Sequence, residues 1–193
     1  MEELAALYSH HKSFYGWYFP DETCIILNYS KDFMKYVNLC SAKCHELTPD
    51  KKTLIAPYGT NLVRANDRFI RSLAELDVDF IAYQDEVGVR KTRVDKTKKL
   101  FEKLRLAHDK AGRSELWADI ELFDFEGIVY NSALIPADFE RVKKQIRNVE
   151  PYADKILGYQ FLGLMNPPVS LSFAGNEASA EFYEDYKKYL EEK

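Results

Sequence analysis

The sequence lacks the features that mark several common classes of protein. No apolar run approaches the roughly 18 residues of a membrane helix, so we expect no membrane partner. The first residues, Met-Glu-Glu-Leu, have neither the basic nor the apolar region of a secretory signal, and as written the chain is expected in the cytoplasm. The formal net charge of -4 and the pI near 5.7 lack the basic excess of nucleic-acid binders, so we expect no nucleic acid.

Cysteine is scarce, and nucleotide-binding loops are missing. The three cysteines are Cys24, Cys40 and Cys44, and no second Cys/His pair at zinc spacing follows the last two. We therefore predict free thiols and no metal site. No Gly-x-Gly-x-x-Gly follows any predicted strand and no P-loop occurs. The sequence therefore predicts no cofactor.

Aromatic residues, by contrast, are abundant. They make up 14% of the 193 residues, with 13 Tyr and 12 Phe. Their ring faces are surfaces on which sugar rings can stack. The length predicts a single domain over residues 1–193, with a sizeable core.

Apolar periodicity predicts a short helix at 2–10, followed by five strand–helix units. The predicted strands are 13–20, 53–57, 78–83, 115–123 and 155–162. Five helices are predicted after these strands. The first is capped by Ser30, the second carries apolar residues over 62–76, and the third covers 94–111. The fourth starts at Pro136, and the fifth carries an aromatic stripe over 182–190. Strict alternation with nearly continuous apolar strands indicates a parallel sheet covered by helices.

Two α/β architectures fit this order, an open doubly wound sheet and a barrel. Five strands suit the first by number, whereas acids at the ends of several different strands suit the second. At about 35 residues per unit, eight units need roughly 280 residues, so about three units are lacking. We therefore predict a partial (β/α)8 TIM-type barrel, with five parallel strand–helix units after a short helix. This would be the C-terminal five-eighths of a barrel.

The fourth predicted strand has two unlike faces. Trp117, Asp119, Glu121 and Phe123 alternate with an entirely apolar set that begins at Leu116. Carboxylates beside large rings are costly to bury unless they are paired or in use. Glu121 is therefore the leading candidate for a functional residue.

Glu22 ends the first predicted strand and is the expected partner of Glu121. If three units precede this chain, the two carboxylates face each other across the barrel mouth. Glycoside hydrolysis needs such a pair: one acid protonates the leaving oxygen, and one carboxylate attacks the anomeric carbon or activates water. We expect the rings of Trp17 and Phe19 to raise the pKa of the acid by desolvation.

Five motifs at successive strand ends resemble a known family. They are Gly16-Trp-Tyr-Phe-Pro-Asp-Glu22, Ala56-Pro-Tyr58, Tyr83-Gln-Asp85 with Gly88, Trp117-Ala-Asp-Ile-Glu121 and Gly158-Tyr-Gln160. Over nearly the whole chain, the sequence looks like the C-terminal part of a bacterial family of unknown function, described as glycoside-hydrolase-like TIM barrels. Members of that family generally look exported.

The resemblance implies a glycoside hydrolase that acts on a glycan. Glu22 is placed like the acid/base, and Glu121 like the nucleophile, of the large retaining glycosidase clan. One departure is Asp21, because that clan usually has Asn before its acid. Carbohydrate is the expected partner, and the following residues are the expected substrate contacts: Trp17, Tyr18, Asp21, Tyr58, Asn61, Tyr83, Gln84, Asp85, Trp117, Asp119, Tyr159 and Gln160.

Other interpretations of the same residues stay open. Asp119 and Glu121 could form a structural ion-pair set, and Glu22 could be an anion at a helix N-terminus. Gln84 and Asp85 could hold a loop. A hard cation such as Ca²⁺ or Mg²⁺ could instead be bound by the acids together: Asp21, Glu22, Asp85, Glu86, Asp119 and Glu121. A non-catalytic partial barrel could instead bind carbohydrate, or self-associate through open sheet edges or with a missing N-terminal barrel portion.

Overall fold

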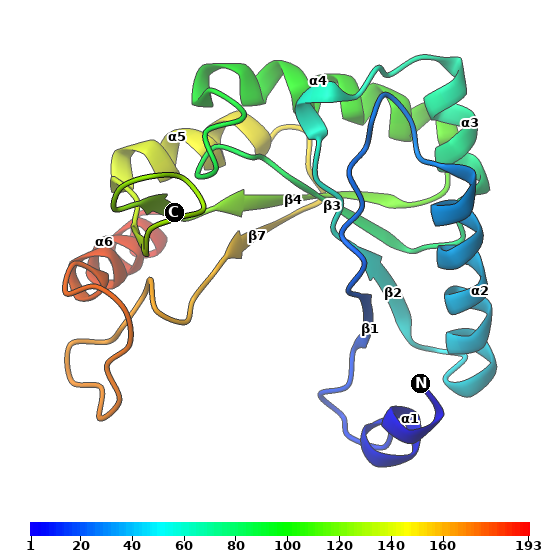
Figure 1. Cartoon of the computed structure of the whole chain (residues 1–193). Helices are drawn as coiled ribbons and strands as arrows, with labels where there is room; N and C mark the ends of the chain where they lie inside the picture. Colours follow the sequence, from blue (N-terminus) through cyan, green and yellow to red (C-terminus); the bar gives the residue numbers. More distant parts are fainter.

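The structure, a computed structural model, describes residues 1–193. A five-stranded parallel sheet with the order β1-β2-β3-β4-β7 lies at its centre (Figure 1). The strands are β1 (Gly16–Phe19), β2 (Lys52–Ile55), β3 (Phe80–Gln84), β4 (Glu115–Glu121) and β7 (Lys155–Tyr159). All five predicted strands are present and all are parallel, which confirms the predicted fold class of a partial TIM-type barrel.

Helices cover one face of this sheet. Figure 1 shows α2 to α5 along the outer side, while the inner face of the curved sheet carries no helix. The helices are α1 (Glu2–Tyr8), α2 (Lys31–Leu47), α3 (Asp67–Glu75), α4 (Val94–Ala111), α5 (Phe139–Val149) and α6 (Ser179–Glu191), with a 3-10 turn at Thr60–Leu62. No helix is both long and apolar enough to cross a bilayer.

Local sequence explains where the helices begin and end. Ser30 caps α2 by accepting the Phe33 N–H at 3.1 Å, and Gly112 ends α4 in a left-handed conformation. The predicted helix start near Leu62 is wrong. There the chain makes only the 3-10 turn, and α3 begins after Asn66, whose side chain caps it.

The segment after β4 also differs from the prediction. A short antiparallel pair, β5 (Phe123–Phe125) and β6 (Leu134–Pro136), lies mostly in the stretch between the predicted strand 115–123 and the predicted helix that starts at Pro136. Pro136 therefore ends a strand and does not start a helix. The following helix, α5, begins later, because the Asp138 side chain accepts the Arg141 N–H at 3.0 Å.

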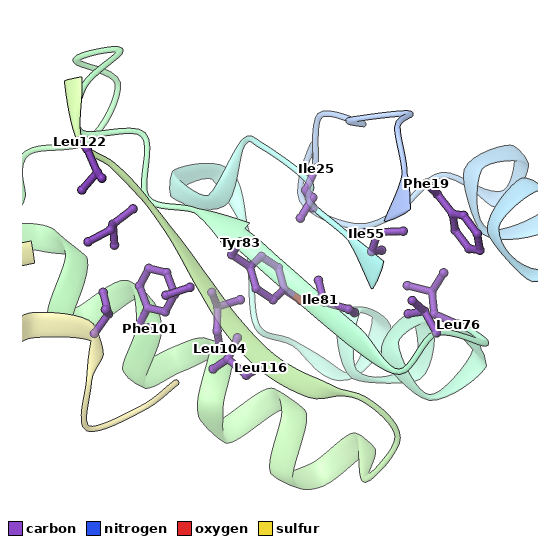
Figure 2. Packing of buried hydrophobic residues seen from close by; sticks show 14 of the residues in the cluster. Phe19, Ile25, Ile55, Leu76, Ile81, Tyr83, Phe101, Leu104, Leu116 and Leu122 are labelled. Atoms are coloured by element: carbon purple, nitrogen blue, oxygen red, sulfur yellow. The ribbon is translucent and has the colours of Figure 1, made fainter. Parts of the chain in front are cut away.

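The main core lies between the sheet and helices α2 to α5 (Figure 2). The predicted apolar face of β4 is part of it: Leu116, Ala118 and Ile120 are all buried there. Trp117 belongs to a separate small cluster on the inner face, where its ring stacks on Phe80 with centroids 4.1 Å apart. As alternation predicted, Leu116, Ala118 and Ile120 lie on the helix-covered face of β4, and Trp117 lies on the other face.

Candidate carboxylate site at the ends of the strands

A two-part hollow lies at the C-terminal ends of β1, β3 and β4, and we call it the mouth cleft. Its two adjoining lobes have volumes of about 330 and 280 Å³ and share Glu22, Gln84, Val89, Glu121 and Tyr130. The Lys91 lobe adds Tyr58, Glu86 and Lys91. The Asp119 lobe adds Asp119, Phe123 and Tyr159. The structure therefore brings Glu22 and Glu121 to one cleft.

Glu121 is buried at the end of β4, with 5% of its surface exposed. Its Oε2 accepts the Val89 N–H at 2.7 Å. Burial raises the pKa of Glu121 to about 8, and the charges of Asp85 and Glu86 act in the same direction. Glu121 is therefore mostly protonated near neutral pH, which suits a proton donor.

Gly88 allows this contact, because the β3–α4 loop passes very close to the end of β4. A Cβ built on Gly88 would lie 2.6 Å from the Phe123 carbonyl oxygen and 3.0 Å from Cβ of Glu121. Only a residue without a side chain fits at that distance. The next N–H in the chain, that of Val89, then points at the carboxyl of Glu121.

Glu22 is an exposed carboxylate held by two donors. The Tyr18 hydroxyl donates to its Oε1 at 2.7 Å, and Gln84 Nε2 donates to its Oε2 at 3.1 Å. The rings expected to desolvate it are elsewhere, because Trp17 and Phe19 point into the core on the helical side. Glu22 follows β1 without starting a helix, so the helix-terminus interpretation does not hold.

Asp119 lies one inward-facing position below Glu121 and lines the second lobe. Burial raises its pKa to about 7, helped by the charges of Asp85 and Glu22. No salt bridge joins Asp119 or Glu121 to a Lys or Arg, in contrast to the structural ion-pair interpretation. Tyr159, about half exposed, lines the same lobe and contacts the Phe123 ring edge-to-face.

Asp85 is structural, which corrects its prediction as a substrate contact. It is completely buried, and its Oδ1 accepts the N–H groups of Val87 and Glu121, each at 3.2 Å. Its Oδ2 accepts Gln145 Nε2 of α5 at 2.6 Å. Burial raises its pKa to about 6. Asp85 thus ties the loop after β3 and helix α5 to the backbone of Glu121.

Three predicted aromatic contacts lie away from the cleft. Tyr83 is completely buried on the helical side (Figure 2), and its hydroxyl lies 3.0 Å from His108 Nε2. Trp17 donates from Nε1 to Thr48 Oγ1 at the end of α2. Trp117 shares the face of Glu121 but lies nearer the start of the strand, outside both lobes. Their positions follow from alternation, which places Trp17 and Tyr83 on the helical face.

The remaining predicted contacts are divided. Tyr58, Gln84 and Tyr159 line the mouth cleft together with Asp119, and Tyr18 contacts it through Glu22. Asp21, Asn61 and Gln160 line neither lobe. Asn61 instead supports the loop wall: its N–H donates to Glu86 Oε2 at 3.3 Å, and its Nδ2 donates to the Lys91 carbonyl oxygen at 3.1 Å.

Four residues that line the cleft were not predicted, Val89, Lys91, Phe123 and Tyr130, and a fifth, Glu86, was named only as a possible cation ligand. Val89, Lys91 and Tyr130 lie in loops, several residues beyond the strand that precedes each of them, so no strand-end pattern marks them. No group of three or more His, Cys, Asp or Glu side chains is arranged to hold a metal ion. Glu22 and Glu121 line both lobes of the cleft, and Asp119 lines one of them.

Comparison with known protein families assigns the chain to one of them. The family described as "Domain of unknown function (DUF4434)" matches residues 1–172. The chain belongs to this family. No protein with curated annotation matches the chain.

A solved structure extends the comparison to three dimensions. A crystal structure from Bacteroides thetaiotaomicron, described as a putative alpha-L-fucosidase, covers 100% of this DUF4434 chain with a TM-score of 0.79 and 21% sequence identity. The chain spans 61% of that protein's length. At this identity the likeness establishes the shared fold, and the activity of the chain has to be argued from its own site.

Proposed function

We propose that the mouth cleft binds a glycan and hydrolyses a glycosidic bond, with Glu22 and Glu121 as the reacting carboxyl pair. The observation that carries the proposal is that these two side chains, from the ends of β1 and β4, line one cleft in unlike environments. The tyrosines at its rim offer faces for a sugar ring. The fold shared with a protein described as a putative alpha-L-fucosidase supports the same class of reaction.

The environments of the two carboxyl groups favour a division of labour opposite to the one implied by the resemblance. Glu121 is buried with its pKa raised to about 8, so it carries a proton to donate. Glu22 is exposed and accepts two hydrogen bonds, from Tyr18 and Gln84, which stabilise a carboxylate anion. We therefore assign proton donation to Glu121.

The reaction then proceeds with a balanced set of transfers. The carboxyl of Glu121 gives its proton to the glycosidic oxygen as the bond to the anomeric carbon breaks. The carboxylate of Glu22 either attacks that carbon or takes a proton from the water that attacks it. In the first case, the Glu121 carboxylate then takes a proton from the water that releases the sugar.

Aryl glycosides with leaving groups of different acidity test both the activity and the assignment. Glu121→Gln should lose activity on substrates with poor leaving groups by about a hundredfold or more, and keep most of it on strongly activated ones, which need no proton donor. Glu22→Gln should lose activity on both kinds of substrate. If instead Glu22→Gln kept activity on the strongly activated substrates and Glu121→Gln lost activity on both kinds, Glu22 would be the proton donor, as the resemblance implies.

Glu126→Gln is the matched control, because Glu126 is an exposed glutamate outside the cleft. Its kinetics should equal those of the unaltered chain. Equal activity of Glu121→Gln and the unaltered chain on every substrate would remove Glu121 from the reaction. Absence of hydrolysis on a broad glycan panel would refute the enzymatic proposal.

The sheet edges favour a second candidate, a binding module completed by another chain. The strands β1 and β7 are the outermost of the sheet, so each has one side without a strand neighbour. An apolar hollow of about 310 Å³ lies beside β7, between Ile156, Phe161 and Tyr186. We propose that this edge pairs with a second copy or with the barrel units that would precede β1. Light scattering tests it, and a monomer across a wide concentration range would contradict self-association.

A further inference from the structure

The Lys91 lobe contains a buried carboxylate oxygen that nothing in the protein satisfies. Glu86 is 1% exposed, and its Oε1 has no hydrogen-bond partner. Its Oε2 accepts only the Asn61 N–H, at 3.3 Å. Buried acceptors are normally paired, because an unpaired one costs free energy. Glu86 also has a left-handed backbone, with φ of 56°, which is uncommon for a residue with a side chain.

Lys91 is fixed directly beside that oxygen. Its Nζ lies 4.0 Å from Glu86 Oε1, close enough for attraction but too far for a hydrogen bond. Its ammonium also lies over the rings of Tyr58 and Tyr130, 5.0 and 5.8 Å from their centroids. In addition, the Lys91 N–H donates to the Glu86 carbonyl oxygen at 3.1 Å. The backbone of one tight loop therefore positions both side chains.

The separation of 4.0 Å suits one bridging hydroxyl group. An oxygen about 2.8 Å from each atom can accept a hydrogen bond from the ammonium and donate its own proton to the carboxylate. A hydroxyl is the simplest group that does both at once. Such a bridge would satisfy Oε1 and add a close partner for the ammonium.

The charge of the lobe limits which ligand can bring that hydroxyl. The lobe is lined by the carboxylates of Glu22 and Glu86, against one ammonium, that of Lys91, while the third acid, Glu121, is mostly protonated near neutral pH. A ligand carboxylate, sulfate or phosphate would meet more repulsion than attraction. An uncharged polyhydroxylated ring carries the required hydroxyl without that cost.

We propose that Glu86 and Lys91 form the subsite that selects an uncharged sugar, with one ligand hydroxyl bridging Lys91 Nζ and Glu86 Oε1. This inference rests on the proposed function only in taking the ligand to be a sugar. To the proposed function it adds the residues that recognise the sugar, Glu86 and Lys91, and the expectation that acidic sugars are excluded. The rings of Tyr58 and Tyr130 hold the ammonium in place.

Binding measured without turnover tests the subsite. Ligand-observed NMR titrations of the full chain would use glucose, galactose and mannose, with glucuronate and galacturonate as acidic counterparts. We expect saturable binding of a neutral sugar, and binding of its uronate about tenfold weaker or worse. Lys91→Met, which keeps the apolar stem, should weaken the neutral sugar about tenfold, and so should a deoxy analogue that lacks the bridging hydroxyl.

Controls separate the subsite from a general loss of fold. Lys98→Met removes an exposed ammonium from α4, outside both lobes, and should leave binding unchanged. Glu86→Gln keeps the shape of the side chain, and it should weaken binding less than Glu86→Ala. Thermal denaturation of each variant shows whether the fold is intact.

The outcomes separate this inference from the hydrolase proposal. Neutral sugars that bind in a Lys91-dependent way without hydrolysis would support the subsite and refute the enzyme. Hydrolysis with a KM unaffected by Lys91→Met would support the enzyme and overturn the subsite. Uronates that bind as tightly as neutral sugars would overturn it, as would the absence of saturable binding by any neutral sugar.

Discussion

Replacing Glu121 by Gln should stabilise the fold, and increasingly so as the pH rises. The folded chain holds the Glu121 proton up to a pKa of about 8, whereas the unfolded chain releases it near the ordinary value of 4.5. The folded state therefore binds more protons between these values, and the free energy of unfolding falls as the pH rises through that window. The glutamine side chain of the Glu121→Gln variant would keep the shape and the acceptor for the Val89 N–H without this loss.

The size of the effect follows from the same two values. Each pH unit between 4.5 and the pKa of about 8 is worth about 1.4 kcal/mol. At neutral pH, the loss due to Glu121 is about 3 kcal/mol, and above the folded pKa it approaches about 5 kcal/mol. Asp85 and Asp119 have pKa values of about 6 and 7 in the folded chain, so they also make the free energy of unfolding fall as the pH rises. This contribution is present both in the unaltered chain and in Glu121→Gln.

Urea denaturation at several pH values measures this difference directly. The free energies of unfolding of Glu121→Gln and of the unaltered chain should converge at about pH 4.5 and separate progressively up to about pH 8. Glu126→Gln, at an exposed site, should follow the unaltered chain at every pH. Parallel curves for Glu121→Gln and the unaltered chain would refute the claim that Glu121 is protonated by burial.

Two further predictions concern the frame of the site. Gly88→Ala should lower the free energy of unfolding by about 1–3 kcal/mol, because its Cβ would lie 2.6 Å from the Phe123 carbonyl oxygen; Gly127→Ala, with its nearest neighbour at 3.5 Å, should be tolerated. Equal melting temperatures of the two variants would contradict the close approach. Asp85→Ala should cost about 2–4 kcal/mol, because it leaves the buried N–H groups of Val87 and Glu121 without acceptors. Asp85→Asn, which keeps an acceptor, should cost less, and calorimetry that ranks them in reverse would contradict the structural role.

Much of the fold could be predicted because its signals are local. Alternation along β4 separated Leu116 and Ile120 from Glu121, and the structure places them on opposite faces. The 94–111 helix has the predicted limits, with Gly112 in the left-handed conformation that ends it. The β5–β6 pair was missed because each strand is only three residues long, too short for a periodic pattern to indicate a strand.

The site was only partly predictable, because its membership depends on which face each strand turns inward. The motif Tyr83-Gln-Asp85 looked like three neighbouring contacts, but only Gln84 faces the cleft. Its two neighbours point to the helical side, where Tyr83 meets His108 and Asp85 meets Gln145. Adjacent residues in a strand cannot share a face, so a continuous motif overstates the number of contacts.

The sequence by itself determined the α/β alternation, the parallel sheet and the two glutamates at strand ends. These features depend on the order of neighbouring residues, namely on apolar periodicity and on the polar residues that follow each strand. Only the tertiary structure decided how those glutamates differ. Burial under the β3–α4 loop keeps Glu121 protonated, while Tyr18 and Gln84 hold Glu22 as an exposed acceptor. Protonation depends on solvent exposure and on neighbours from distant segments, and both are set when the strands come together.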